Sequence, residues 1–198
     1  MEQEKNVFKV KRNHIRPEKG KILISEPFLK GICFQRAVIL LVEHNSNGTM
    51  GFVLNKQTDL KVNDFLPELK HLPDIPIYLG GPVQFNHLFY IHVLDEMIVP
   101  DGVKIVGNLR FDGNFDAMKQ YIASGGAVEG NIKFFMGYSG WGENQLNEEL
   151  VRDSWLVGKC SIENIMMADG ESFWDNALDM LGSPYNIWKN YPKNPDWN

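Results

Sequence analysis

Cysteine and histidine are scarce in this chain of 198 residues, which contains two cysteines and five histidines. Cys33 and Cys160 are too few to form the framework of several disulfides that stabilises small secreted proteins. No Cys-x-x-Cys pair occurs, and His87 and His92 would point to opposite faces of one strand. We therefore expect no metal site and no cofactor, and both cysteines are interpreted as small buried side chains in a reducing compartment.

Long apolar segments are missing too. No stretch approaches the roughly 18 apolar residues of a membrane-spanning helix. The first residues, MEQEKNVFKVKRN, contain nothing like the apolar core of a signal peptide. We therefore expect a cytoplasmic protein with no membrane partner. Hydrophobic residues make up 43% and aromatic residues 12% of the chain, a composition typical of one globular domain at this length.

Complete motifs for phosphate binding or nucleophilic catalysis are also absent. Gly80-Gly81-Pro82 lacks the Lys-Ser/Thr pair and the glycine spacing of a phosphate-binding loop, so it is interpreted as a tight turn. Gly137-Tyr-Ser-Gly-Trp141 places Ser139 between glycines after an apolar run, but tryptophan replaces the last glycine of the G-x-S-x-G elbow. No histidine follows His92, so the usual order of a Ser–acid–His triad is missing.

A structural role is favoured for the segment around Ser139, although a triad in another chain order stays an alternative. Gly140 and Gly142 would let the chain leave the strand through backbone angles that other residues avoid. Trp141 between them would anchor the turn by burying a large ring. Glu143 or Asn144 would cap the following helix.

The charge is unevenly distributed along the chain, whose net charge is −5. Six of the 20 basic residues lie between Lys9 and Lys21 with only one of the 25 acidic residues, which leaves 14 basic and 24 acidic residues elsewhere. We expect this basic arm to be solvated or to pack on its own acidic domain. It contains Pro17 and Gly20, which interrupt a recognition helix, so we expect no sequence-specific binding of DNA.

Apolar periodicity predicts strands and helices that mix without a regular β-α-β alternation, which favours an α+β fold over a doubly wound sheet. The continuous apolar run from Ala37 to Val42 predicts the most buried strand, paired antiparallel with 50–54. If Asn47-Gly48 forms the turn of this hairpin, His44 faces Gly51. Further strands are expected at 21–25, 77–79, 88–93, 103–106, 132–136 and 154–160, and helices at 62–69, 114–123, 143–152 and 171–181.

Several short motifs, taken in order, resemble the YqgE/AlgH family of bacterial proteins over about 20–182. They are Gly20-Lys-Ile-Leu-Ile-Ser-Glu-Pro27, Phe34-Gln-Arg36, Glu43-His44, Gly48-Thr-Met-Gly-Phe-Val-Leu-Asn55, Tyr78-Leu-Gly-Gly-Pro-Val83 and Gly137-Tyr-Ser-Gly-Trp141 with Gln145-Leu146. The resemblance implies a single α+β domain with flanking helices and a branched, strongly bent mixed sheet that approaches a barrel. We therefore divide the chain into a basic arm (1–20), this domain (21–182) and an aromatic, proline-rich tail (183–198).

Two functions are compatible with these observations. One branch of the family is named for the regulation of alginate synthesis genes, so the resemblance implies a regulator of transcription, here interpreted as a non-enzymatic binding protein for an unknown protein or small molecule. The alternative is a small hydrolase that uses His44 with Ser139 or Glu149. Convergence of Arg36, His44, Asn55 and Gln145 in one pocket would distinguish them. The candidate ligand or partner surface comprises Arg36, His44, Asn55, Gly80, Gly81, Trp141, Gln145 and Glu149.

Overall fold

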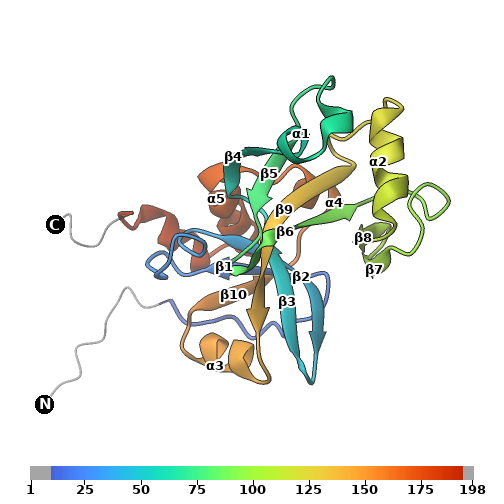
Figure 1. Cartoon of the computed structure of the whole chain (residues 1–198). Coiled ribbons are helices and arrows are strands. Elements are labelled where there is room, and N and C mark those ends of the chain that lie inside the picture. The colour runs from blue at the N-terminus through green and yellow to red at the C-terminus, as the bar shows by residue number, and fades with distance from the viewer. Residues whose placement is uncertain (1–9, 194–198) are drawn as a thin grey trace, which may run out of the picture.

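The computed structural model describes residues 10–193, which form one α+β domain around a large sheet (Figure 1). Most neighbouring strands of this sheet are antiparallel, and β5 and β9 are parallel. The strands are β1 (Ile22–Ser25), β2 (Val38–Asn45), β3 (Gly48–Val53), β4 (Gln57–Lys61), β5 (Pro76–Leu79), β6 (Val83–His92), β7 (Val103–Val106), β8 (Leu109–Phe111), β9 (Ile132–Trp141) and β10 (Trp155–Gly158).

The sheet branches at β9, as the family resemblance implies. The main path runs β10-β1-β2-β3-β9-β6-β8-β7, and β5 joins β9 outside this path and carries β4. One edge of β9 pairs first with β5 and then, beyond Gly137, with β3. Gly137 has a φ of +68°, a conformation that favours glycine, and it marks the change of partner. The path ends at β10 and β7 without pairing them, so the sheet is not closed into a barrel.

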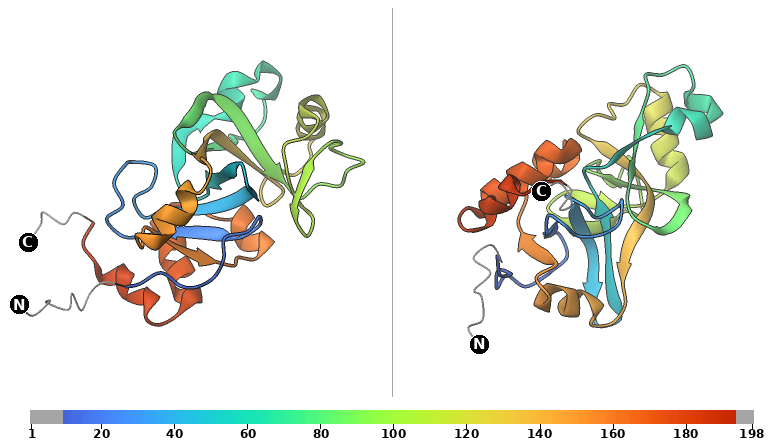
Figure 2. Two further views of the ribbon diagram at one scale, coloured as in Figure 1. Left: turned by 90° about the horizontal axis from the view of Figure 1, so that it is seen from below. Right: turned by 90° about the vertical axis from the view of Figure 1, so that its left-hand side faces the viewer.

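Helices cover the sheet on several sides. Figure 2 shows α3 and α5 on opposite sides of β1 and β2, while α1 and α2 pack against the half that contains β5, β6 and β9. The helices are α1 (Val62–Phe65), α2 (Phe115–Ala123), α3 (Gln145–Val151), α4 (Ile162–Met166) and α5 (Gly170–Leu181), with 3₁₀ turns at Pro67–Leu69 and Tyr185–Asn190. Among the described residues, none of these helices has the length and apolarity needed to cross a membrane.

The predictions that the apolar run of β2 is buried and that it pairs with β3 are confirmed, and β1 is buried to the same extent. Val38 and Leu40 pack in the cluster that includes α5, whereas Ile39 and Leu41 pack in the cluster that includes α3. All four side chains are fully buried. Because alternate residues of a strand face opposite sides, a strand covered on both faces needs an unbroken apolar run.

The predicted register of this hairpin is wrong. His44 pairs with Thr49 and Asn45 with Gly48, so the two-residue turn is Ser46-Asn47. The Asn45 side chain accepts a hydrogen bond from the Asn47 backbone N–H at 2.8 Å, which stabilises this turn. A bulge after Leu41 shifts the pairing further, so Gly51 lies opposite Leu41.

β9 is longer than predicted, and this corrects the interpretation of Ser139. The chain does not leave the strand at Gly140, because Ser139 and Trp141 both pair with β3. The next helix begins only at Gln145, after Asn144 in a left-handed conformation that makes no side-chain cap. The backbone ladder with β3 thus overrides the local preference of the glycines for a turn.

The segments that flank the domain pack against it where the structure describes them. Val10 is buried, and the side chain of Asn13 makes two hydrogen bonds to the backbone of Val157, at 2.6 and 3.1 Å. These hydrogen bonds satisfy the backbone N–H and carbonyl groups of Val157 on the edge of β10 that pairs with no other described strand. At the other end, Trp188 is buried. Residues 1–9 and 194–198, which include Lys9 of the predicted basic arm and the end of the tail, lie outside the described residues.

Candidate functional site

A cavity of about 710 Å³ opens beside the start of β9. Its walls come from the segment before β5, from the end of α2 and the loop 125–130, and from the residues between α4 and α5. Most wall side chains are apolar, among them Ile75, Ile122, Val128, Ile132 and Met166. Small-ligand pockets are typically about 300–1,000 Å³ and mainly apolar, with a few polar groups, so the cavity has the size and lining of a binding site.

Lys133 is the main polar group in this cavity. Lys133 is only 4% exposed, and its Nζ donates a hydrogen bond to the carbonyl oxygen of Ala168. The same nitrogen lies 3.6 Å from the centre of the Tyr78 ring, an attractive cation–π position. Burial lowers the pKa of Lys133 to about 7, and the charge of Asp169 partly opposes this shift. A substantial fraction of Lys133 is therefore uncharged near neutral pH.

Tyr78 and Asp169 are polar groups of the cavity that lie near Lys133. Burial, followed by the negative charge of Asp169, raises the pKa of Tyr78 to about 12, so its hydroxyl stays protonated at neutral pH. Within residues 10–193 this hydroxyl has no hydrogen-bond partner, which leaves it free to donate to a ligand. Asp169 accepts a hydrogen bond from the backbone N–H of Gly170 and so caps α5.

Sequence reasoning missed Lys133 because it assigned the lysine only to a strand. The signal that could have found it is one charged residue within Ile132-Lys-Phe-Phe-Met136, a run whose other members are apolar and buried. A lysine in a strand with both faces covered cannot reach water easily, so its charge is destabilised.

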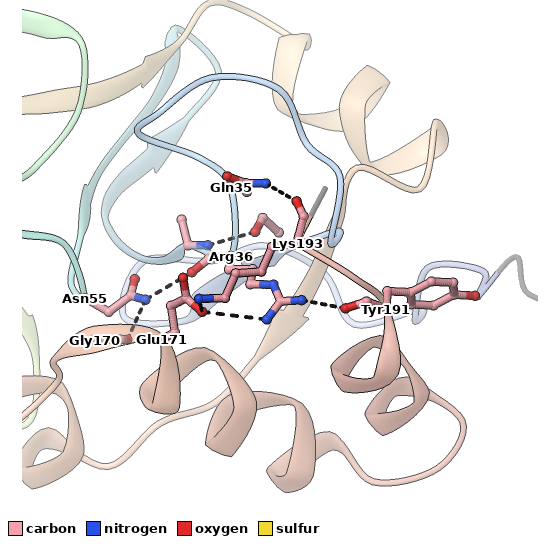
Figure 3. A network of polar contacts seen from close by, with 9 residues as sticks. Gln35, Arg36, Asn55, Gly170, Glu171, Tyr191 and Lys193 are labelled. Atoms are coloured by element: carbon pink, nitrogen blue, oxygen red, sulfur yellow. Dashed lines mark hydrogen bonds and ion pairs between the residues drawn. The ribbon is translucent and has the colours of Figure 1, made fainter. Parts of the chain in front are cut away.

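The predicted site residues occupy separate places in the structure. Arg36 and Asn55 lie in a polar network near the C-terminal segment (Figure 3). Asn55 accepts from the Val38 N–H at 2.9 Å and donates to the carbonyl oxygens of Arg36 and Gly170 at 3.0 and 2.9 Å. All its contacts are with backbone, so Asn55 joins β2 to the start of α5.

Arg36 binds the C-terminal segment. Its Nη2 donates to the Tyr191 carbonyl oxygen at 2.6 Å, its Nη1 lies 3.7 Å from a Glu171 oxygen, and its guanidinium lies 5.1 Å from the Trp174 ring centre (Figure 3). Lys193 also pairs with Glu171, at 2.8 Å. These contacts anchor residues 191–193 on the domain.

His44 lies at the tip of the β2–β3 hairpin. Its Nδ1 and the Thr49 hydroxyl are 2.7 Å apart, a hydrogen bond between the two strands of the hairpin. A second, smaller hollow of about 220 Å³ lies beside it, lined by the hairpin tip and residues 142–147.

Trp141, Gln145 and Glu149 form a third group. One Glu149 oxygen accepts from the indole N–H groups of Trp141 and Trp155 at 2.8 and 2.7 Å, and the other accepts from Gln145 at 3.0 Å. Gln145 also accepts from the Gly142 N–H at 3.0 Å. These hydrogen bonds fasten α3 to the sheet.

Gly80 and Gly81 allow a close backbone contact with β9. A Cβ on Gly80 would lie 2.2 Å from the Gly137 oxygen, and one on Gly81 would lie 2.3 Å from the Tyr138 carbonyl. The hydroxyl of Ser139 is fully buried and donates to the Gly80 carbonyl oxygen at 3.1 Å.

The residues whose convergence would distinguish the two functions do not meet in one pocket. Arg36 and Asn55 hold the C-terminal side of the domain, His44 lies at the hairpin tip, and Gln145 holds α3. The hydrolase pairs are not formed in this geometry, because His44 contacts Thr49 and Glu149 contacts two indoles. Among residues 10–193, no cluster of three or more His, Cys, Asp or Glu side chains could hold a metal ion.

Fold and site together define a class of single-domain α+β proteins with a branched, open sheet and an apolar cavity around a buried lysine. The chain belongs to the AlgH-like family, whose model matches residues 22–186. The family resemblance is thus confirmed.

Similar proteins cover nearly the whole chain. A UPF0301 protein of Parabacteroides distasonis is 53% identical over 96% of both chains, and one of Bacteroides thetaiotaomicron is 42% identical over 98% of this chain and 97% of its own. The solution structure of the AlgH protein from Pseudomonas aeruginosa has a TM-score of 0.67 at 29% identity, covering 88% of this chain and 94% of that one. A crystal structure from Corynebacterium diphtheriae matches in fold with a TM-score of 0.73 at 23% identity, over 92% and 95% of the two chains.

Proposed function

We propose that this protein is a cytoplasmic binding protein that takes up a small, neutral, mainly apolar molecule in the cavity around Lys133. The observation that carries the proposal is the cavity itself, about 710 Å³ with apolar walls and one buried amine. Such a cavity gains free energy when an apolar molecule leaves water for it.

The charges on the cavity walls support a neutral ligand over an anionic one. Lys133 is the one basic residue of the lining, whereas Asp74, Glu129 and Asp169 contribute carboxylates. Asp74 is paired with Lys61 at 2.5 Å, but no ion pair with a described residue neutralises Glu129 or Asp169. A carboxylate ligand would be repelled by these groups, while an uncharged ligand would not.

A regulatory role would then operate through the ligand or through a protein partner, not through direct reading of DNA. The support lies in the contacts of the basic arm with the domain. The backbone N–H of Arg12 donates to Asp153 at 2.9 Å, and Lys21 pairs with Glu18 at 3.1 Å. These residues run along the domain in extended or irregular backbone, which offers no helix to a major groove.

The test is binding of Nile red, an uncharged apolar dye whose fluorescence rises in apolar surroundings. We expect the wild type to bind it and Val128→Trp, which fills the cavity from its wall, to bind it several-fold more weakly. Val151→Trp is the matched control, because Val151 is 65% exposed on α3 and does not line the cavity. Absence of wild-type binding, or equal binding by both variants, would contradict the proposal.

A further inference from the structure

We propose that Lys133 forms a reversible imine with an apolar aldehyde or ketone that enters the cavity. The proposal rests on the proposed function and deepens it by naming the chemical class of the ligand and the atom that captures it.

The position of the amine supports this chemistry. Lys133 lines an apolar cavity, and no carboxylate of the described residues forms an ion pair with its Nζ that would hold it as ammonium. Its one hydrogen-bond partner, the Ala168 carbonyl, accepts an N–H and leaves the nitrogen lone pair of the neutral amine free. A desolvated lysine in an apolar pocket is the form in which this side chain acts as a nucleophile.

The other polar groups of the cavity suit a carbonyl compound. The Tyr78 hydroxyl has no partner in residues 10–193 and stays protonated because burial raises its pKa to about 12, so it can donate a hydrogen bond to a carbonyl oxygen. The carboxylate of Asp169 supplies negative charge near Lys133, which stabilises a protonated imine. A carboxylic acid forms no imine for Asp169 to stabilise, and its ionised form would be repelled by that carboxylate.

The reaction needs no oxidant or reductant. The lone pair of Lys133 Nζ attacks the carbonyl carbon, a C–N bond forms, and the carbonyl π electrons move to the oxygen, which is protonated to give a carbinolamine. The C–O bond then breaks, and the carbonyl oxygen leaves as water. One amine and one carbonyl compound therefore give one imine and one water. The two hydrogens of the amine leave with the carbonyl oxygen as that water.

Lys56 provides an internal comparison. Burial also lowers the pKa of Lys56, but this lysine lies near Arg36, Glu171 and Lys193 and does not line the cavity. If lowered basicity alone determined reaction with an apolar aldehyde, Lys56 and Lys133 would both react. Selective reaction at Lys133 would show that the cavity delivers the carbonyl group.

The experiment treats the full-length protein with octanal and sodium cyanoborohydride, which reduces an imine to a stable secondary amine, and locates the octyl group by peptide mass spectrometry. We expect octylation at Lys133 to exceed that at Lys56 by at least tenfold. Lys133→Met should lose this product, and Val128→Trp, in which the lysine remains, should lose most of it. Thermal unfolding followed by circular dichroism confirms that each variant is folded.

A parallel measurement separates the two proposals. Octan-1-ol, which has the same chain but no carbonyl group, should displace Nile red from the cavity without covalent product. Displacement by both compounds with no octylation at Lys133, or with octylation spread equally over surface lysines, would overturn the imine and leave the binding function standing. Failure of Nile red to bind the wild type would overturn the binding function and, with it, the imine that rests on it.

Discussion

Lys133 and Arg36 are both buried basic residues beside an aromatic ring, but their surroundings differ. The guanidinium of Arg36 contacts Tyr191, Glu171 and Trp174, all supplied by the chain itself. Lys133 has one hydrogen-bond acceptor, one ring and an open cavity beside it. The comparison teaches that a buried charge whose partners come from the chain stabilises the fold, whereas one with few partners beside a cavity can serve a ligand.

The largest effect on stability is expected where the polar contacts are most complete, in the group held by Glu149. Trp141→Ala should lower the free energy of unfolding by about 3–5 kcal/mol, because it deletes a buried ring and leaves one Glu149 contact unmade. Urea unfolding measures this.

Ser139→Ala, on the same strand, should leave Nile red binding intact. Covalent labelling of Ser139 by a fluorophosphonate probe would contradict the structural role of this segment.

Arg36→Met should have the next largest effect. It should lower the free energy of unfolding by about 1–3 kcal/mol, because the Tyr191 carbonyl and Glu171 lose a charged partner. A chain ending at Asn190 removes Tyr191 and Lys193 instead. In a double-mutant cycle, the two changes together should cost less than the sum of their separate costs, because they delete the same contacts. Strict additivity would show that Arg36 does not anchor the C-terminal segment.

The lowered pKa of Lys133 should make the stability difference between the wild type and Lys133→Met depend on pH. The unfolded lysine keeps its proton up to about pH 10.5, whereas the folded one loses it near pH 7. Wild-type stability relative to Lys133→Met should therefore rise between about pH 7 and pH 10, by at most about 1.4 kcal/mol per pH unit. Lys159→Met, which removes an exposed lysine, is the matched control. A flat difference for Lys133→Met would mean that the buried amine stays charged.

The smallest effect is expected for the basic arm, since none of its described basic residues, Lys11, Arg12, Arg16 and Lys19, is buried or lines either cavity. Phosphate contacts carry no base information, so binding to a promoter fragment and to a scrambled fragment should be equal. Both should weaken steeply between about 50 and 200 mM salt. Fluorescence anisotropy with labelled fragments measures this. A lasting preference for the promoter at the higher salt would revive direct reading of DNA.

Parts of the fold could be predicted because their causes are local. The run Ala37–Val42 is apolar without interruption, and only a strand covered on both faces places every such side chain in the core. Asn114 caps α2 at a position where a short polar side chain reaches a free N–H, and its contact with Ala117 at 2.9 Å is present. The motifs were also sufficient to identify the family.

Other parts depend on partners distant in sequence. β4, β8 and α4 were not predicted, because their short segments carry little periodicity and are held by neighbours. The hairpin register changed through a bulge after Leu41 and the side chain of Asn45. The role of Glu149 depends on two indole partners, Trp141 and Trp155, which reach it from other segments of the chain.

The sequence by itself therefore determined the α+β class, the buried hairpin of β2 and β3, the approximate bounds of α2 and α5, and the family. Only the tertiary structure decided which polar residues have functional potential. Burial, charge and pKa arise from what surrounds a side chain, and Ala168, Tyr78 and Asp169 come from segments far from Lys133 in the chain. No local sequence pattern predicts that these residues lie together, since their contact follows from how α5, β5 and β9 pack.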